Sequence, residues 1–313
     1  MRRPLLALPV VLASALVLAG CAGDPATPEP SDTADARIDV CEAPGGDVVD
    51  AVEVSGEFGS APTVTIDAPV EIAETERSVL VQGDEVAAGS LVSAAYALYD
   101  GTTGEALETV GWGEGETATY FRGAYDYLGD GFAKTLGCLG PGSRVVGVIP
   151  GAEGFGEAAT QVGLDPETPL VFVVDVLGDA EWSEDLPEVG GTAEAPTVTL
   201  PATAPKPDLG IAVLEEGDGA VVGPADSVSV NYLGTAWETG EVFDESYSGG
   251  QPVTFEVGGV VQGFQEALIG QKVGSRVIVS MPPALGYGLQ PGHALENYTL
   301  VFLIDIVDVA PAG

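Results

Sequence analysis

The sequence predicts an α+β fold made of two successive domains, each a twisted antiparallel sheet wrapped around one short helix. Three observations predict it: a set of landmarks that occurs twice, segments with the two-residue alternation of strands, and one short amphipathic helix in the copy that is easiest to interpret. An antiparallel sheet buries an apolar face only by packing it against another element, and here the single helix is the element available to cover that face.

The landmarks occur in the same order in both halves of the chain. The string APTVT at residues 61–65 recurs at 195–199, and GSRV at residues 142–145 recurs at 274–277. The separation between equivalent positions drifts by a few residues, as loops of unequal length between shared strands would produce. We therefore interpret the chain as a tandem duplication.

The domain boundaries follow from this repeat and from composition. We expect the first domain over residues 51–180 and the second over residues 195–313. Residues 181–194 are rich in acids and contain no Lys or Arg, so we interpret them as a solvated linker.

The second copy shows the expected elements most clearly. Residues 228–233 alternate inward-facing apolar side chains, which is typical of a half-buried strand. In residues 263–270, apolar side chains recur at i, i+3 and i+4, the spacing of one face of a short helix. Runs of β-branched residues predict two more strands, at 275–281 and 298–309.

Residues 1–20 are interpreted as a secretory signal peptide. Arg2 and Arg3 precede an apolar stretch that is shorter than the about 20 residues of a transmembrane helix. The stretch ends in Leu-Ala-Gly before Cys21, which resembles the lipobox of bacterial lipoproteins, whose cysteine is acylated with chains such as palmitate. The alternative is an ordinary signal peptide with a chance cysteine at the cleavage point.

The composition of the chain after the signal peptide indicates a tether and excludes some classes of partner. Residues 21–50 are rich in Pro, Ala, Thr and acids, and we expect them to form a self-repelling tether. Lys and Arg number 10 against 48 Asp and Glu, a net charge of −38. This charge excludes nucleic acid as the natural partner and opposes electrostatic docking on anionic lipid. The expected location is the extracytoplasmic face of the cell membrane, reached through a lipid anchor.

The remaining cysteines form a candidate pair. Once Cys21 is lipidated, Cys41 and Cys138 are left, and an even number in an oxidising compartment favours a disulfide. The alternative is two unpaired buried thiols. With a single His in the chain, we expect no metal site and no cofactor, and a hydrolase is a poor fit.

Four strings in the second copy lie in one order: VSVNYLGTAWETGEVFDESY (228–247), PVTFEVGGVVQGFQEALIGQKVGSRV (252–277), PPALGYG (282–288) and TLVFLIDIVDV (299–309). In order and spacing they resemble the FKBP-type peptidyl-prolyl cis–trans isomerases. The resemblance covers most of residues 208–309. It implies that the second domain binds Xaa–Pro segments in an apolar pocket and that both copies have the FKBP fold.

The resemblance also implies a role for individual residues. The Tyr287 hydroxyl and the Val261 N–H would donate to substrate carbonyls, and Asp244 would accept from the Tyr232 hydroxyl. The implied catalytic residues are Tyr232, Phe243, Asp244, Val260, Val261, Phe264, Tyr287 and Phe302, with Val253 as a substrate contact.

The residue chemistry suits that activity independently. Rotation about an Xaa–Pro bond is slow because amide resonance opposes twisting, with a barrier of about 18–20 kcal/mol. A twisted amide has lost resonance and carries a less polarised carbonyl. A dry aromatic pocket therefore favours it over the planar, better solvated ground state, and no nucleophile or metal is needed.

Several of these residues also have a purely structural interpretation. Phe264, Phe302 and Tyr232 suit a packed core, and Asp244 suits a turn. Two alternatives to an isomerase stay open: a non-catalytic chaperone that binds Pro peptides, and an envelope lipoprotein that uses the fold as a scaffold.

The second copy departs from the family pattern at four places. Gly249 stands where an arginine often pairs with the pocket aspartate, Val253 where some members have Phe, and Phe264 where many have Trp. The loop 288–298 lacks the usual Ile-Pro-Pro segment. The sequence does not decide whether His293 or Leu295 lines the pocket.

In the first copy the implied site is eroded. Leu107 and Glu108 replace Phe243 and Asp244, Leu128 and Gly129 replace Val260 and Val261, and Phe155 replaces Tyr287; Tyr96, Phe132 and Phe172 persist. We expect this copy to hold substrate or to be structural, with weak catalysis as the alternative.

The sequence thus predicts an exported, lipid-anchored peptidyl-prolyl isomerase. The expected partners are Xaa–Pro segments of exported unfolded proteins, the membrane through the anchor, and a macrolide as a candidate ligand.

Overall fold

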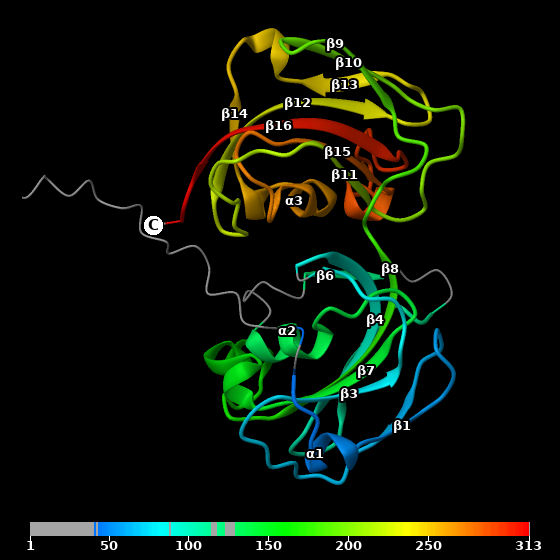
Figure 1. Ribbon diagram of the computed structural model, residues 1–313, viewed down its shortest axis with the longest axis vertical. Coiled ribbons are helices and arrows are strands. Elements are labelled where there is room, and N and C mark those ends of the chain that lie inside the picture. The colour runs from blue at the N-terminus through cyan, green and yellow to red at the C-terminus, as the bar shows by residue number, and fades with distance from the viewer. Residues whose placement is uncertain (1–40, 42, 88, 114–117, 123–128, 313) are drawn as a thin grey trace, which may run out of the picture. The chain divides into compact units, whose positions relative to one another are not determined.

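A computed structural model of the chain (Figure 1) describes residues 41, 43–87, 89–113, 118–122 and 129–312. The predicted signal peptide, Cys21 and most of the predicted tether lie outside these residues. The described part contains two six-stranded antiparallel sheets and two short two-stranded sheets. No helix among the described residues is long and apolar enough to cross a membrane.

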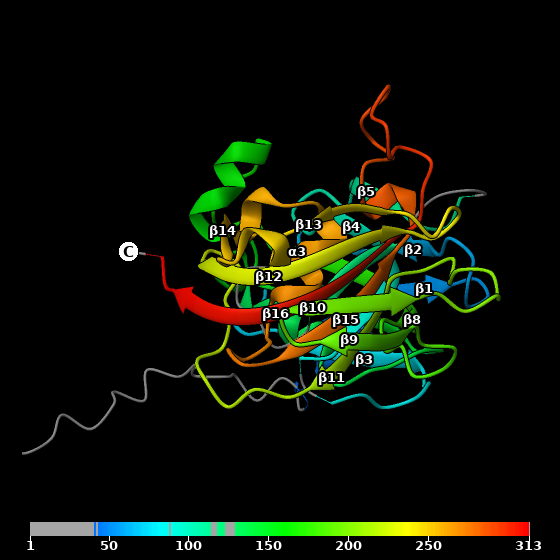
Figure 2. The same cartoon turned by 90° about the horizontal axis from the view of Figure 1, so that it is seen from above.

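The second sheet contains the predicted strands of the second copy. Its strand order is β11-β15-β16-β12-β13. The outer edge of β12 pairs with two strands: β13 along its second half and β14 along its first half. The strands are β11 (Gly210–Glu215), β12 (Ser227–Ala236), β13 (Val242–Glu245), β14 (Val253–Glu256), β15 (Arg276–Met281) and β16 (Leu300–Ala310). The long strands β12 and β16 run side by side and curve together, as Figure 2 shows.

The concave face of the second sheet is buried against helix α3 (Gln262–Leu268). Phe264, Ala267 and Leu268 are buried there, the three residues whose helical spacing predicted this helix. They pack on the apolar side chains that β15 and β16 direct to the same side: Val277, Val279, Met281, Leu300, Phe302 and Ile304. The sheet wraps one short helix, as expected.

The first sheet has the same topology, with order β3-β7-β8-β4-β5 and β6 paired to β4. Its strands are β3 (Glu76–Val81), β4 (Leu91–Asp100), β5 (Ala106–Val110), β6 (Thr119–Arg122), β7 (Arg144–Ile149) and β8 (Leu170–Asp179). Helix α2 (Asp130–Leu136) occupies the place of α3, with Phe132 and Leu136 buried against the sheet. This common topology confirms the two-domain α+β fold.

Irregularities in strand pairing recur at equivalent positions. β4 and β8 shift register at Ser93/Ala94, and β12 and β16 shift at Ser229/Val230. A second pair of shifts follows at Leu98/Tyr99 and Gly234/Thr235. Bulges are local features of a backbone path, so their recurrence supports a duplication of the whole sheet.

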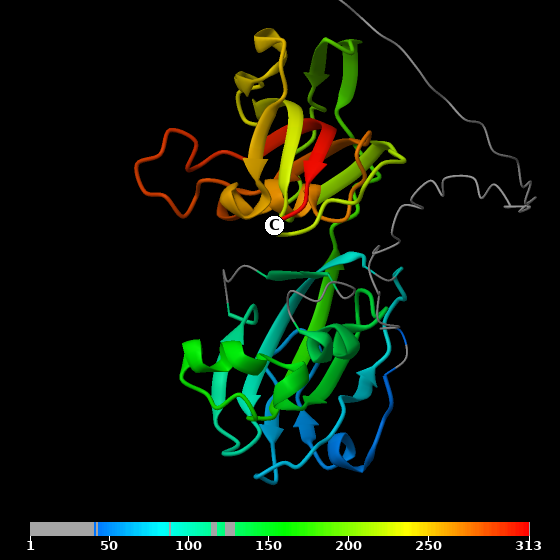
Figure 3. The ribbon, with the colours of Figure 1, turned by 90° about the vertical axis from the view of Figure 1, so that its left-hand side faces the viewer.

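Each sheet is also covered on its convex face. In the second, the hairpin of β9 (Glu188–Thr192) and β10 (Ala195–Thr199) lies on the side away from α3, as Figure 3 shows. Its side chains pack with Trp182, 3% exposed, on Ile278, Val301 and Leu303. Part of the predicted linker 181–194 is therefore a covering layer of the second sheet.

The first sheet has an equivalent cover. The hairpin of β1 (Glu53–Ser55) and β2 (Thr63–Thr65), together with α1 (Asp47–Asp50), packs on Val146, Val148, Val171 and Val173. The repeated string APTVT forms β10 in one copy and overlaps β2 in the other. The described 3₁₀ turns are η2 (Gly151–Glu153), η3 (Gly156–Val162), η4 (Tyr247–Gly249), η5 (Val257–Gly259) and η6 (Pro283–Leu285).

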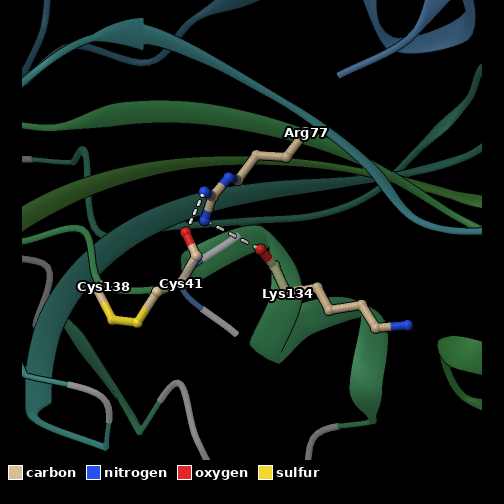
Figure 4. Close-up of a disulfide and its surroundings, with 4 residues drawn as sticks. All are labelled: Cys41, Arg77, Lys134 and Cys138. Carbon is tan, nitrogen blue, oxygen red and sulfur yellow. Dashed lines mark hydrogen bonds between the residues drawn. A yellow bond between two sulfur atoms is a disulfide. The ribbon is translucent and has the colours of Figure 1, made fainter. Parts of the chain in front are cut away.

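Cys41 and Cys138 form a disulfide across 97 residues of chain (Figure 4). The Arg77 guanidinium donates to the carbonyl oxygens of Cys41, at 2.9 Å, and of Lys134, at 3.2 Å, and so fixes the backbone on both sides of the bond. The end of the predicted tether is thereby joined to the segment that follows α2.

Candidate functional site

A cavity of about 500 Å³ opens beside α3 on the concave side of the second sheet. Seven of its lining residues are apolar or aromatic side chains from the sheet and from α3 and its N-terminal approach: Tyr232, Phe243, Phe255, Val260, Val261, Phe264 and Phe302. The remaining lining residues are Asp244, Gly259, Gln262 and, from the chain after β15, Ala284, Leu285, Gly286, Tyr287, Leu289 and Gln290. All eight residues predicted to be catalytic line this one cavity.

The ninth predicted residue, Val253, is not among the lining residues. It lies on β14 opposite Val230, and 36% of its surface is exposed. Phe255, two residues further along β14, lines the cavity instead, with its ring 6.1 Å from that of Phe264. Side chains two apart share a face of a strand, so Val253 lies on the same face of β14 as Phe255, and its role as a substrate contact stays a prediction.

The floor of the cavity is a set of aromatic rings arranged around Phe302. The ring of Phe264 lies 5.0 Å from it at 89°, and that of Phe243 lies 5.4 Å from it at 87°. These edge-to-face contacts place the positive edge of one ring against the negative face of another, which fixes ring orientation. The apolar walls are therefore formed before any ligand enters.

Asp244 is the charged residue of the cavity lining, and it is held by Tyr232. The Tyr232 hydroxyl donates to Asp244 Oδ2 at 2.7 Å, and Asp244 Oδ1 accepts from the Glu245 N–H at 2.9 Å. Burial, and then the hydrogen bond to Asp244, raise the pKa of the Tyr232 phenol well above 10. The phenol therefore stays a donor and keeps the carboxylate oriented at physiological pH.

The loop after Asp244 is anchored by an ion pair. Asp305 accepts from Arg276 Nε at 2.6 Å and Nη2 at 2.7 Å, and from the Tyr247 hydroxyl at 2.9 Å. Tyr247 lies in η4, directly after β13. This network fixes the loop from the sheet side, although Gly249 provides no arginine to pair with Asp244.

Gly234 makes room for Phe243, a role that no sequence pattern predicted. A Cβ on Gly234 would lie 2.6 Å from Phe243 Cζ and 2.8 Å from Phe302 Cε1, closer than real contacts allow. Gly234 lies opposite both Asp244 and Phe302 in the strand pairing. The aromatic wall needs a residue without a side chain at this position.

Val261 is the N-cap residue of α3 and lines the cavity. Its carbonyl accepts from the N–H groups of Phe264 and Gln265, both at 3.0 Å. Within the described part of the chain, no group accepts a hydrogen bond from the Val261 N–H. Val261 lines the cavity, and its N–H is a candidate donor to a ligand there.

The first copy keeps one feature of the site and lacks others. The Tyr96 hydroxyl donates to Glu108 Oε2 at 2.7 Å, as Tyr232 does to Asp244. Leu98, however, pairs with Glu108 and Phe172 in the register that Gly234 has in the second copy, and it is buried. Its side chain takes the space of a Phe243-like ring, and Leu107 is left 41% exposed.

Phe155, the counterpart of Tyr287, turns into the core of the first copy. Its ring lies 5.5 Å from that of Phe132 on α2. Gly129 precedes α2 as its N-cap, and Leu128 lies outside the described residues. Leu98 and Phe155 both pack inward in the first copy. We infer that they fill space that belongs to the cavity in the second copy.

No group of three or more potential metal ligands occurs among the described residues. The lining residues with polar side chains are Tyr232, Tyr287, Asp244, Gln262 and Gln290, which provide two hydroxyl groups, one carboxylate and two amides.

Comparison with known proteins places the second copy in a family. Residues 219–307 match the family described as FKBP-type peptidyl-prolyl cis-trans isomerase. A probable FK506-binding protein of Corynebacterium glutamicum is 41% identical over 115 residues, which are 36% of this chain and 98% of the relative. The chain belongs to the FKBP-type peptidyl-prolyl isomerase family. Isomerisation of Xaa–Pro bonds is accordingly the activity of its FKBP domain.

Other relatives match the same part of the chain. The isomerase FkpA of Escherichia coli is 41% identical over 102 residues, 32% of this chain and 37% of FkpA. Its crystal structure is 39% identical over 34% of this chain and 49% of that one, with a TM-score of 0.32. The structure of the three FKBP domains of wheat FKBP73 covers 75% of this chain and 94% of its own, at 19% identity and a TM-score of 0.32.

Proposed function

We propose that the FKBP domain accelerates Xaa–Pro rotation in exported proteins by binding the twisted amide in the cavity beside α3. The observation that carries this proposal is the preformed aromatic floor around Phe302. An apolar wall gives the proline ring a dry site and offers little to the planar, strongly polarised amide. Stronger binding of the twisted form lowers the barrier to rotation.

The polar groups of the cavity have separate tasks in this mechanism. The Tyr287 hydroxyl and the Val261 N–H donate to substrate carbonyls next to the rotating bond and hold the chain on either side of it. Asp244 stays bound to Tyr232 at the edge of the cavity. Since no bond is made or broken, positioning and exclusion of water account for the catalysis.

The test compares the full chain with its Phe243→Ala and Val242→Ala variants. Val242 precedes Phe243 in β13, is 54% exposed, and does not line the cavity. We expect Phe243→Ala to lower kcat/KM for a Xaa–Pro peptide by about tenfold or more, equal to about 1.4 kcal/mol of transition-state binding. Val242→Ala should stay within about twofold.

The same measurement separates the rival functions. If the unmodified chain binds a Pro peptide but does not accelerate its isomerisation, the protein is a Pro-peptide-binding chaperone. If it neither binds nor accelerates, the fold is a scaffold. Binding is measured by titration of a labelled Pro peptide.

We further propose that the protein is an exported lipoprotein on the extracytoplasmic face of the cell membrane. Support comes from the basic and apolar residues 1–20 followed by Cys21, and from the acid-rich residues that follow. Cys21→Ala should abolish labelling with radioactive palmitate and release the protein from membranes. Continued retention of that variant with the membrane fraction would refute lipid anchoring.

A macrolide is a proposed ligand of the same cavity. Three relatives are named FK506-binding proteins, and most of the residues that line the cavity are apolar or aromatic. FK506 should compete with a Pro peptide for the unmodified chain and bind Phe243→Ala more weakly. Equal binding to both would place the macrolide elsewhere.

We propose that the first copy is structural or holds substrate without catalysing its rotation. Buried Leu98 and the inward packing of Phe155 support this role. Phe243→Ala combined with Tyr287→Phe in the full chain should reduce catalysis to the background rate. Residual activity that a further Tyr96→Phe change removes would assign catalysis to the first copy.

A further inference from the structure

The single histidine of the chain stacks on a tyrosine of the cavity wall. The ring centroids of Tyr287 and His293 are 4.0 Å apart, and the ring planes differ by 13°. His293 is half-buried and lies in the loop 288–298, where this chain departs from the family pattern. One face of the Tyr287 ring is thus covered by a side chain of that loop.

The loop is folded so that it presents this ring. The Gln290 N–H donates to the Tyr287 carbonyl at 2.9 Å, and the His293 N–H donates to the Gln290 carbonyl at 3.0 Å. Two successive turns therefore carry the chain from Tyr287 back over its own ring. A backbone path closed by hydrogen bonds loses little further entropy when the two rings stack.

The imidazole itself completes the fold of the loop. Nδ1 of His293 accepts from the Leu295 N–H at 3.1 Å, and the His293 carbonyl accepts from the Glu296 N–H at 3.1 Å. A nitrogen that accepts carries no proton, so Nε2 carries it in the neutral ring. The His293 ring is held by the chain on one side and by Tyr287 on the other.

The first copy shows what the equivalent ring does without this partner. Phe155 packs 5.5 Å from Phe132, on the helix that forms the core of its domain. Among the described residues, Tyr287 has no such ring contact with Phe264, the equivalent of Phe132; its ring contact is with His293. Both rings pack against the core of their own domain, and what distinguishes Tyr287 is that its ring stacks on His293 at the cavity wall.

We propose that His293 is a positioning residue, which acts through Tyr287 to fix the direction of the hydroxyl that binds substrate. This role rests on the proposed function of the cavity. A stacked ring cannot rotate about its Cα–Cβ bond without losing the contact, so the hydroxyl is oriented before substrate arrives. An oriented donor raises kcat more than it lowers KM, since it loses no freedom as the amide twists.

The test uses three substitutions in the full chain. His293→Ala removes both the ring and the Nδ1 acceptor, His293→Phe keeps a stacking ring, and His293→Asn keeps a short polar acceptor. We expect His293→Ala and His293→Asn to lower kcat by about two- to tenfold, as loss of one ring pair implies. His293→Phe should restore most of the activity. Restoration by Asn and not by Phe would overturn the proposal.

A double-mutant cycle separates positioning from a general structural effect. In a Tyr287→Phe background the hydroxyl is absent, so His293→Ala should cause little further loss of kcat. An equal loss in both backgrounds would show that His293 acts on the fold of the loop alone. Full activity of His293→Ala would likewise refute the role.

A spectroscopic measurement distinguishes failure of this inference from failure of the proposed function. Because the chain has one histidine, its ring proton resonances are assigned without ambiguity. Tyr287→Ala should move both resonances, since the ring current of Tyr287 is lost. If they move and no isomerase activity is found, the stack exists and the function is wrong. If they do not move, the stack is absent.

Discussion

The ring of Phe243 occupies the space that a side chain at Gly234 would need. A Cβ built on Gly234 lies 2.6 Å from Phe243 Cζ and 2.9 Å from Phe243 Cε2. The aromatic wall of the cavity thus depends on a residue with no side chain, and in the first copy Leu98 occupies the equivalent position.

Gly234→Ala should therefore damage the site. We expect kcat/KM to fall by about tenfold, because the added methyl group displaces Phe243 from the edge of Phe302. Gly249→Ala is the matched control, since Gly249 is exposed and a Cβ there meets no atom within 4 Å. Unchanged isomerase activity in Gly234→Ala would show that the Phe243 ring is free to move.

The Tyr232–Asp244 hydrogen bond should give stability that is lost at alkaline pH. Burial and then Asp244 raise the pKa of Tyr232 above its ordinary value of 10.0. A group whose pKa is raised on folding stabilises the folded state fully below its unfolded pKa, and this contribution is lost as pH rises through the folded pKa. Tyr232→Phe should cost about 1 kcal/mol at pH 7.

The difference between the unmodified chain and Tyr232→Phe should therefore be constant up to about pH 9 and shrink above pH 10. It is measured as the free energy of unfolding in urea at each pH. A difference that grows with alkaline pH would have the wrong sign and would contradict the assignment of Tyr232 as a neutral donor.

Trp182→Ala should destabilise the FKBP domain, although Trp182 lies outside residues 219–307, which match the family. Trp182 is 3% exposed and packs on the convex face of the second sheet. Removal of a buried Trp ring costs about 3–5 kcal/mol. The measurement is the urea concentration at which isomerase activity is half lost. Val213→Ala, at a 45% exposed position of β11, is the control and should shift that midpoint little.

Loss of the disulfide should destabilise the first domain and leave catalysis unchanged. The bond between Cys41 and Cys138 closes a loop of 97 residues, and disulfides contribute about 2–4 kcal/mol. Cys41→Ala combined with Cys138→Ala should lower the melting temperature of one calorimetric transition, while kcat/KM stays within about twofold. A reductant should have no further effect on the double variant, and a large effect would reveal another source of redox sensitivity.

The elements with a strong periodic signal were predicted well. The predicted strand 228–233 lies within β12, and the helix predicted over 263–270 is α3, displaced by one or two residues. Strands β15 and β16 also match their predicted ranges closely. In each case, one face of the strand or helix is buried against the core, and this burial produces the periodic apolar pattern that predicted the element.

The β9–β10 hairpin was not predicted because its sequence resembles a linker. Gly190 and Gly191 interrupt β9, and Val189 is its one partly buried side chain, so little apolar alternation is present. The cover is formed instead by contacts distant in sequence, between Val189 or Trp182 and the convex face. Such contacts leave no local pattern to read.

The residues of the site also divide into those that a sequence pattern predicted and those that it did not. Aromatic and acidic residues carried a signal, and the eight predicted catalytic residues meet in one cavity. Gly234 carried none, because its contribution is the absence of a side chain. The roles of Leu289 and Gln290 in the lining depend on a loop path that only the folded structure defines.

The covered convex faces bear on how such a protein can be built by repetition. A sheet with one bare apolar face needs a neighbour to bury it, and a second copy added to the gene would expose another such face. Here each copy has its own hairpin ahead of its sheet. Each repeat therefore contains three layers, the hairpin, the sheet and the helix, and both faces of the sheet are covered within the repeat. What was duplicated is a complete folding unit, free to acquire a different role in each copy.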